Sequence, residues 1–126
     1  MEVRGIEPLA STVPWQSRAR SVSRTWDLWH DRAVFHFLTN SDDRDAYLRV
    51  LSHALISGGG LVVGTFAPDG PDQCSGLPTA RYDAASLVDT IRSVLHIEVL
   101  ATMQEVHVTP SDVEQPFTWV ACRRQG

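Results

Sequence analysis

His30, Asp31 and Arg32 stand side by side, directly after a short apolar segment that holds Trp26 and Trp29. A histidine has a pKa close to neutrality, so His30 could take a proton from a reacting nucleophile as a catalytic base. Alternatively, Asp31 and Arg32 pair with each other or cap the next turn, and His30 only forms a hydrogen bond. The three residues therefore predict either one wall of a ligand pocket or an ordinary polar strand end.

Residues 26–29 are typical of a short buried strand, so the polar triplet would leave the carboxyl end of that strand. In open α/β sheets, ligands bind outside the carboxyl ends of the strands. We therefore expect His30, Asp31 and Arg32 beside a ligand, with Phe35 next to them or in the core. His36 lies among apolar neighbours, which favours a packed, hydrogen-bonded histidine.

A second candidate group follows the continuous apolar run 61–67, which is typical of a strand covered on both faces. Cys74, Ser75 and Gly76 lie in the turn-rich segment 68–80, and long connections are often functional. Cys74 could be a nucleophile or a metal ligand, but it has no partner at a spacing typical of either. We expect this loop to shape a substrate pocket; the alternative is a structural turn.

Arg81 and Tyr82 precede the next predicted helix. Arg81 could bind a carboxylate or phosphate with two parallel hydrogen bonds, or it could pair with Asp83. His107 lies near the end of a later strand and is a further candidate for the substrate pocket. His30, Cys74 and His107 would form a zinc site only if the fold gathered them, and we expect no metal.

The pattern along the chain predicts the element order β-α-β-α-β-β. A helix over 41–57 begins at Asn40 or Ser41 and ends at the glycines 58–60, and Asp83 caps a helix over 84–94. Residues 96–109 and 116–124 are predicted strands, and their short connection indicates an antiparallel hairpin.

Composition places the chain among globular proteins. It has 126 residues, a hydrophobic fraction of 43% and a net charge of -4, which gives no basic field for nucleic acid. No apolar segment is long enough to be a membrane span or a signal peptide. We expect a cytoplasmic protein with one domain over 25–126 and a disordered or irregular tail over 1–24. The basic run in that tail could alternatively bind an anion.

Several segments together resemble the C-terminal half of class I S-adenosylmethionine-dependent methyltransferases of a small-molecule, bacterial type. "DLWHDRAVFHFL" is similar to the fourth strand and its loop, and "GGGLVVGTFAPDGPDQCSGLP" to the fifth strand and its loop. "RYDAASL" is similar to the start of the fifth helix, and "EVHVTP" with "QPFTW" to the last two strands. The resemblance implies a partial Rossmann-like α/β fold. Its mostly parallel sheet ends in an antiparallel hairpin, with strand order 4-5-7-6 of the full fold.

The resemblance also implies S-adenosylmethionine as cofactor and a small molecule as methyl acceptor. His30, Asp31, Arg32 and Phe35 would then lie beside the cofactor, and the 74–76 loop, Arg81, Tyr82 and His107 beside the acceptor. The family's glycine-rich turn and its acidic ribose ligand have no counterpart before Trp26. Three strand-helix units would need about 90 residues. We therefore expect a truncated methyltransferase that is inactive or weakly active alone.

Two other functions compete with this one. The first is a non-catalytic α/β module that pairs with another chain through an exposed strand edge, at residues 26–30. The second is a metal-dependent hydrolase, for which the sequence offers little support. Self-association through the 26–30 edge is expected because a strand without a neighbour exposes unpaired N–H and C=O groups.

Overall fold

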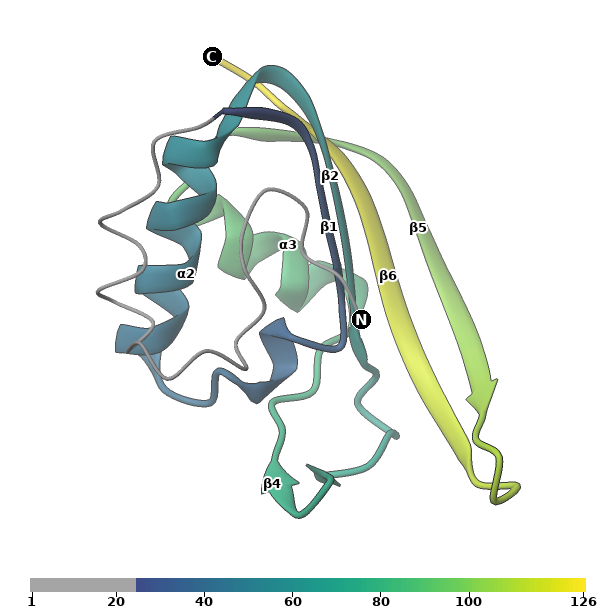
Figure 1. The fold of residues 1–126 in the computed structure, drawn as a ribbon. Coiled ribbons are helices and arrows are strands. Elements are labelled where there is room, and N and C mark those ends of the chain that lie inside the picture. The colour runs from purple at the N-terminus through teal and green to yellow at the C-terminus, as the bar shows by residue number, and fades with distance from the viewer. Residues whose placement is uncertain (1–24) are drawn as a thin grey trace.

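The computed structural model describes residues 25–126 (Figure 1). The predictions made for the tail over 1–24 lie outside the described residues. The elements in chain order are β1 (Trp26–Arg32), the 3-10 helix η1 (Phe35–Phe37), α2 (Ser41–Ala54), β2 (Leu55–Phe66), β3 (Gln73–Cys74), β4 (Leu77–Pro78), α3 (Ala84–Arg92), β5 (Ile97–Val108) and β6 (Glu114–Arg124).

Four strands form one mixed sheet in the order β1-β2-β6-β5. β1 and β2 are parallel, whereas β6 runs antiparallel to both of its neighbours. The last strand along the chain therefore lies inside the sheet, between β2 and β5. This confirms the predicted parallel pair closed by an antiparallel hairpin, and it confirms the predicted strand order.

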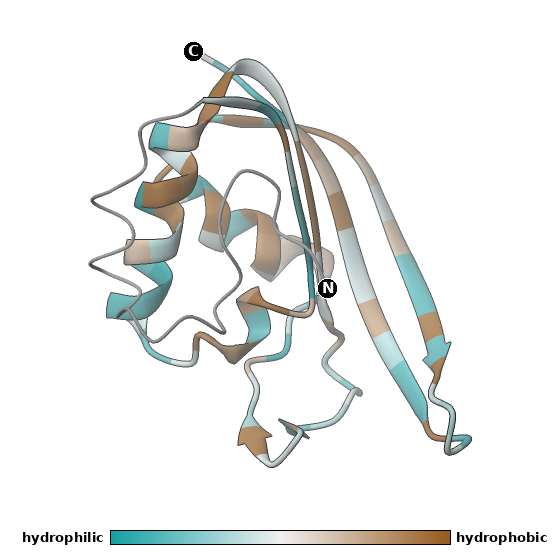
Figure 2. Ribbon diagram, viewed as in Figure 1, coloured by the Kyte–Doolittle hydropathy of each residue, from teal (hydrophilic) through white to brown (hydrophobic). Residues whose placement is uncertain are grey.

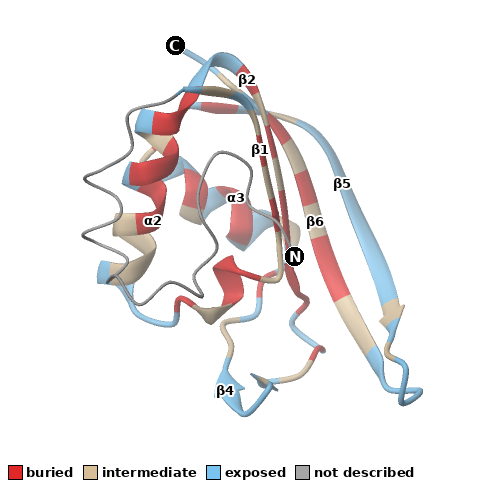
Figure 3. Ribbon diagram, in the orientation of Figure 1, coloured by how far each residue is buried: buried red, intermediate tan, exposed pale blue. Residues whose placement is uncertain are grey.

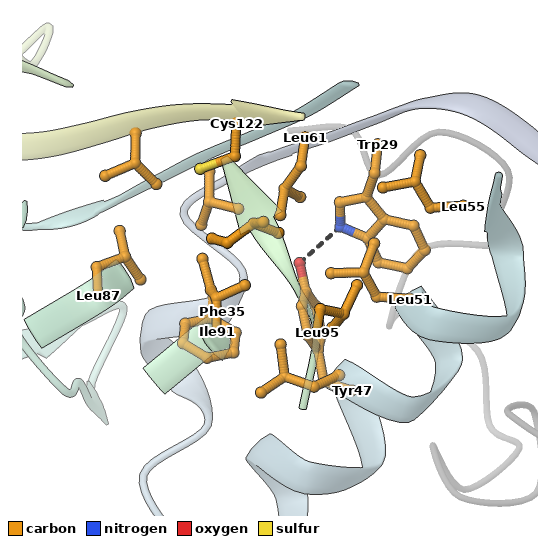
Figure 4. Packing of buried hydrophobic residues seen from close by; sticks show 14 of the residues in the cluster. Trp29, Phe35, Tyr47, Leu51, Leu55, Leu61, Leu87, Ile91, Leu95 and Cys122 are labelled. Carbon is orange, nitrogen blue, oxygen red and sulfur yellow. Dashed lines mark hydrogen bonds between the residues drawn. The ribbon is translucent and has the colours of Figure 1, made fainter. Parts of the chain in front are cut away.

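Both helices and η1 lie on the same side of the sheet (Figure 1). The core fills the space between them and the sheet (Figures 3 and 4), and its largest fully buried side chains include Trp29, Tyr47, Phe35, Leu51, Leu61, Leu87 and Ile91. α2 supplies Tyr47 and Leu51, and α3 supplies Leu87 and Ile91, in each case from positions four residues apart on one side of the helix. Figure 2 shows brown, hydrophobic stretches that alternate with teal, hydrophilic ones along the two helices.

Each helix begins at the cap that its sequence predicts. The Asn40 side chain accepts from the N–H of Asp43 at the start of α2. Asp83 and Ser86 form a capping box at the start of α3, in which each side chain accepts from the other residue's N–H. Because these side chains satisfy backbone donors of the first turn, they fix where each helix starts.

The end of α2 differs from the prediction. The helix stops at Ala54 rather than near residue 57, and the strand assignment begins at Leu55. The glycines at 58–60 lie instead in an irregular part of β2. Trp26 of β1 pairs with Leu55 and Leu28 pairs with Gly60, so β2 holds extra residues between these two pairs. Gly58 takes a positive φ of 79° there. The guanidinium of Arg124 donates to the carbonyls of Ser52 and Leu55. These hydrogen bonds give carbonyl groups at the end of α2 a partner, and no glycine cap is needed.

The sheet face opposite the helices is open among the described residues. Trp119 is only half-buried and lies on this open face, across Gly64 of β2. A Cβ at Gly64 would come within 2.7 Å of the indole carbons. The missing side chain therefore lets the indole reach across β2 to His30 of β1, where the two rings stack with centroids 6.0 Å apart.

Replacing Gly64 with alanine should lower the free energy of unfolding by about 1–3 kcal/mol, the usual cost of overpacking. Gly60→Ala is the matched control, because its Cβ would meet the Leu28 side chain at 3.4 Å and the Asp27 carbonyl at 3.9 Å, which are ordinary contact distances. Urea unfolding measures both. In a Trp119→Val background the cost of Gly64→Ala should largely disappear; an unchanged cost would show that the indole is not the obstacle.

Candidate functional site

The carboxyl ends of the parallel strands meet at one edge of the sheet. β1 includes His30, Asp31 and Arg32 as its last residues, so the polar triplet lies within the strand and does not follow it as predicted. Ala33 turns the chain with a positive φ of 62° and donates its N–H to the carbonyl of Gly64. Because side chains alternate along a strand, the three polar residues separate onto two faces of the sheet.

Asp31 points to the covered face and is completely buried. Its carboxylate accepts from the N–H groups of Val34 and Phe35 at 2.9 and 3.1 Å, and from the hydroxyl of Tyr47. The Tyr47 oxygen in turn accepts from the indole N–H of Trp29 at 2.8 Å (Figure 4). Asp31 therefore caps the turn after β1 and joins it to α2, and both of its oxygens are engaged within this chain.

This buried network changes the acidity of its members. Burial raises the pKa of Asp31 to about 6, although the hydrogen bonds from Tyr47, Val34 and Phe35 act in the opposite direction. Burial and the neighbouring Asp31 carboxylate raise the pKa of Tyr47 well above its ordinary value. Near neutral pH the network therefore holds a largely ionised Asp31 next to a neutral phenol.

His36 is also completely buried, as the sequence predicts. Its Nδ1 accepts from the N–H of Phe66 at 3.0 Å, so the proton of the neutral ring sits on Nε2. Nε2 has no hydrogen-bond partner among the described residues. Burial lowers the pKa of His36 to about 4, so the ring is neutral under ordinary conditions.

His30 and Arg32 point to the open face of the sheet. His30 stacks on Trp119, and the Arg32 guanidinium lies 4.9 Å from the centre of the Phe117 ring. Arg32 forms no ion pair with any residue from 25 to 126. The two side chains thus form cross-strand stacks from β1 to β6, and neither lies beside the Asp31 carboxylate.

The loop after β2 contains a small hairpin that the sequence did not predict. β3 and β4 pair through Cys74 and Leu77, and Ser75 and Gly76 form the turn with positive φ angles of 53° and 79°. Two positive φ angles are typical of a type I′ turn. Ser75 and Gly76 are exposed, while Cys74 is half-buried and a free thiol.

Arg81 does not form the ion pair with Asp83 that was one of its two predicted contacts. Its guanidinium donates to the carbonyls of Pro68 and Gly70 at 3.2 and 3.3 Å, which ties down the base of the loop. Tyr82 is buried, and its carbonyl accepts from the Thr118 hydroxyl at 2.7 Å. Burial raises the pKa of Tyr82, while the nearby positive charge of Arg44 opposes that shift.

The structure brings some of the candidate residues together and leaves others apart. Phe35, in the core, packs against Tyr82 with ring centroids 5.7 Å apart. His107 and Arg32 both contact Phe117, from β5 and β1 respectively. The hairpin at 74–76 joins neither group, and the described residues contain no cluster of three metal-ligating side chains.

Phe117 is the residue that the sequence prediction missed. It lies at the centre of an aromatic group with Phe66, His36 and Trp119, and it lines a groove of about 250 Å³. The groove opens between the start of the loop after β2 and the β5–β6 hairpin, and its lining includes Ala67, Asp69, Glu105, Glu114 and Pro116. The sequence around Phe117 gave no sign that this residue lines a groove, because most of the residues around it come from distant segments.

Solved structures with the same arrangement of elements are methyltransferases. The chain is similar to the N-methyltransferase NodS of Bradyrhizobium japonicum bound to S-adenosylhomocysteine, with a TM-score of 0.63 and 12% identity over 92% of this chain. It is similar to a 1,6-didemethyltoxoflavin-N1-methyltransferase of Burkholderia thailandensis, with a TM-score of 0.59 and 17% identity over 79% of this chain. TehB of Haemophilus influenzae gives a TM-score of 0.61 and 11% identity over 91% of this chain.

The chain has a class I methyltransferase-like fold. It spans about half of the methyltransferase structures named above: 54% of NodS, 44% of the 1,6-didemethyltoxoflavin-N1-methyltransferase and 40% of TehB. No protein-family model and no curated protein matches the sequence. Within residues 25–126 of this methyltransferase-like fold, no helix is long and apolar enough to span a bilayer.

The two buried ionisable groups should make stability depend on pH in opposite senses. The folded pKa of Asp31 lies above its unfolded value of 3.8. Its contribution to the free energy of unfolding is therefore fully present below about pH 4 and is lost as the pH rises through 6. A shift of about two units corresponds to about 3 kcal/mol. The folded pKa of His36 is depressed, so its contribution is present above pH 6.5 and is lost as the pH falls toward 4.

Asp31→Asn should therefore lose stability on acidification from pH 6.5 to 4, because only the His36 effect remains. His36→Gln, which keeps an acceptor for the N–H of Phe66, should gain stability over the same range. Urea unfolding at several pH values measures the two slopes. Equal slopes in both variants would contradict the assignment of these groups.

Proposed function

We propose that this chain is the acceptor-side half of an S-adenosylmethionine-dependent methyltransferase acting on a small molecule, in a bacterial cytoplasm. The observation that carries the proposal is the topology, in which an antiparallel β6 is inserted between β2 and β5 beside the parallel pair β1 and β2. The likeness to NodS, crystallised with S-adenosylhomocysteine, supports it. The net charge of -4 offers no attraction for nucleic acid.

The described residues supply only part of a cofactor cradle. A cofactor of this kind is usually held where a glycine-rich turn meets a helix N-terminus. Here the segment between β1 and α2, residues 33–40, contains no glycine, and the first turn of α2 carries two acidic side chains. The first turn of α3 is occupied by its own capping box. Asp31 is engaged in the core, which leaves His30 and Arg32 as the candidate residues beside a cofactor.

The same geometry suggests where the methyl acceptor would bind. The groove beside Phe117 opens after the carboxyl end of β2, and His107 and Arg32 contact the same ring. Methyl transfer needs little acid-base chemistry, because a sulfonium is already a good leaving group, and rate depends on proximity and orientation. The role proposed for these residues is therefore to position the acceptor, and His30 is the remaining candidate for a base.

A second candidate function is a non-catalytic interaction module. It is favoured by the outer side of β1, which has no strand beside it among residues 25–126. Parallel strands are usually covered on both faces, whereas the helices of residues 25–126 cover only one face of this β1–β2 pair. A module of this kind would bind another polypeptide and would need no cofactor.

Isothermal titration calorimetry of the 126-residue chain with S-adenosylhomocysteine should show no micromolar binding. A micromolar dissociation constant corresponds to about -8 kcal/mol, which is too favourable for one wall of a pocket. NodS, a solved structure that contains this ligand, is the positive control. Micromolar binding by this chain would show that the cradle is complete.

The nucleotide sequence upstream of the codon for Met1 separates the two candidate functions. For a methyltransferase, that sequence should encode a glycine-rich strand-turn-helix segment in one of its reading frames. An upstream region without such a segment would favour the interaction module.

A further inference from the structure

The outer edge of β1 is regular from Leu28 to Arg32. Residues 28–32 of β1 follow residues 60–64 of β2 without interruption, and no described strand lies on the other side. An edge of this kind presents unpaired N–H and C=O groups, which form a template for another strand. The opposite edge strand, β5, is interrupted in its middle, between Val99 and Ala101, whereas the irregularity of β1 lies near its start, between Trp26 and Leu28. Such irregularities are one common protection of an edge.

The direction of the backbone groups in β1 follows from one hydrogen bond. The N–H of Ala33 donates to Gly64 in β2. Because successive residues of a strand point their N–H and C=O groups to opposite sides, Trp29 and Asp31 also point theirs toward β2. The groups of Leu28, His30 and Arg32 therefore face outward, away from the sheet.

The side chains of these outward-facing residues lie on the open face and are only half-buried. Leu28, His30 and Arg32 would thus gain both backbone partners and side-chain neighbours from one added strand. Proline, which would block such pairing, is absent from β1, and lysine is absent from the whole sequence. Lysine and proline are two of the residues by which edge strands avoid association.

We propose that β1 pairs with β1 of a second copy, antiparallel about a two-fold axis, so that the two sheets join into one. A two-fold interface uses the same surface of both copies, so the edge must be complementary to itself. A pairing centred on Trp29 places Asp27 opposite Asp31 of the other copy, and like charges directly opposite are destabilising. Pairings centred on Leu28 or on His30 avoid that conflict.

The two favourable registers have different central pairs. In the first, Leu28 lies opposite Leu28 of the other copy, which buries an apolar side chain that is half-exposed in one copy. In the second, His30 lies opposite His30, and Leu28 lies opposite Arg32. The dimer does not depend on methyl transfer, so its failure would leave the proposed enzymatic function untouched.

The backbone direction gives a selective test with a matched control. Proline at position 30 removes an outward N–H and leaves the ladder to β2 intact, whereas His30→Ala removes the same side chain but keeps that N–H. Sedimentation equilibrium of the full chain should show a monomer–dimer equilibrium for the natural chain. His30→Pro should raise the dimer dissociation constant at least tenfold, and His30→Ala should leave it within threefold.

Three results would overturn the proposal: a natural chain that is monomeric at every concentration, a dimer that His30→Pro leaves intact, and equal losses in the proline and alanine variants. A monomeric natural chain would mean that the β1 edge does not bind a second copy and is open to a different polypeptide. A dimer that survives His30→Pro would mean that the copies contact each other elsewhere, for example through β5. Far-ultraviolet circular dichroism at low concentration checks that the proline variant is folded.

Cross-linking tests the same pairing without proline. In a Cys74→Ser background, which removes the half-buried thiol, Leu28→Cys or His30→Cys should form a disulfide-linked dimer on mild oxidation. Residues opposite each other across an antiparallel pair lie within the Cα separation that a disulfide spans. Leu28→Cys reports the first register and His30→Cys the second, and failure of both to cross-link would also overturn the proposal.

Discussion

The carboxylate of Asp31 holds three parts of the chain at one point. It accepts from the backbone of the turn after β1 and from Tyr47 of α2, and Tyr47 accepts from Trp29 within β1 itself. A buried carboxylate is costly unless its oxygens are satisfied, so this arrangement fixes the turn, the helix and the strand relative to one another. The positive φ of Ala33 and the position of His36 under Phe66 follow from it.

Local sequence patterns could predict the parts of the fold that depend on neighbours along the chain. Asn40 and Asp83 cap the two helices, and both caps are predictable because a side-chain acceptor directly before an apolar stripe is a pattern of neighbouring residues. The position of β6 inside the sheet was predictable only through the resemblance to methyltransferases. It depends on which distant strands pair, and nothing within residues 114–124 specifies that choice.

The candidate site was less predictable, because adjacent residues in a strand do not share a face. His30, Asp31 and Arg32 suggested one pocket wall, but a strand three residues longer than expected places Asp31 in the core and the other two on the open face. The absent side chain of Gly64 then decides where Trp119 lies. The partners of Arg81 are carbonyl groups, which any residue provides, so no sequence pattern could have identified them.

The interior position of β6 has a consequence for synthesis of the chain on the ribosome. β2 emerges well before β6, and until β6 arrives its strongly apolar segment, Leu61–Phe66, has β1 on one side and nothing on the other. Segments rich in β-branched residues that wait for a distant partner are prone to aggregate before folding is complete. Among residues 25–126, β5 also has no partner in the sheet until β6 arrives, so the four-stranded sheet can close only after residues 114–124 have been made.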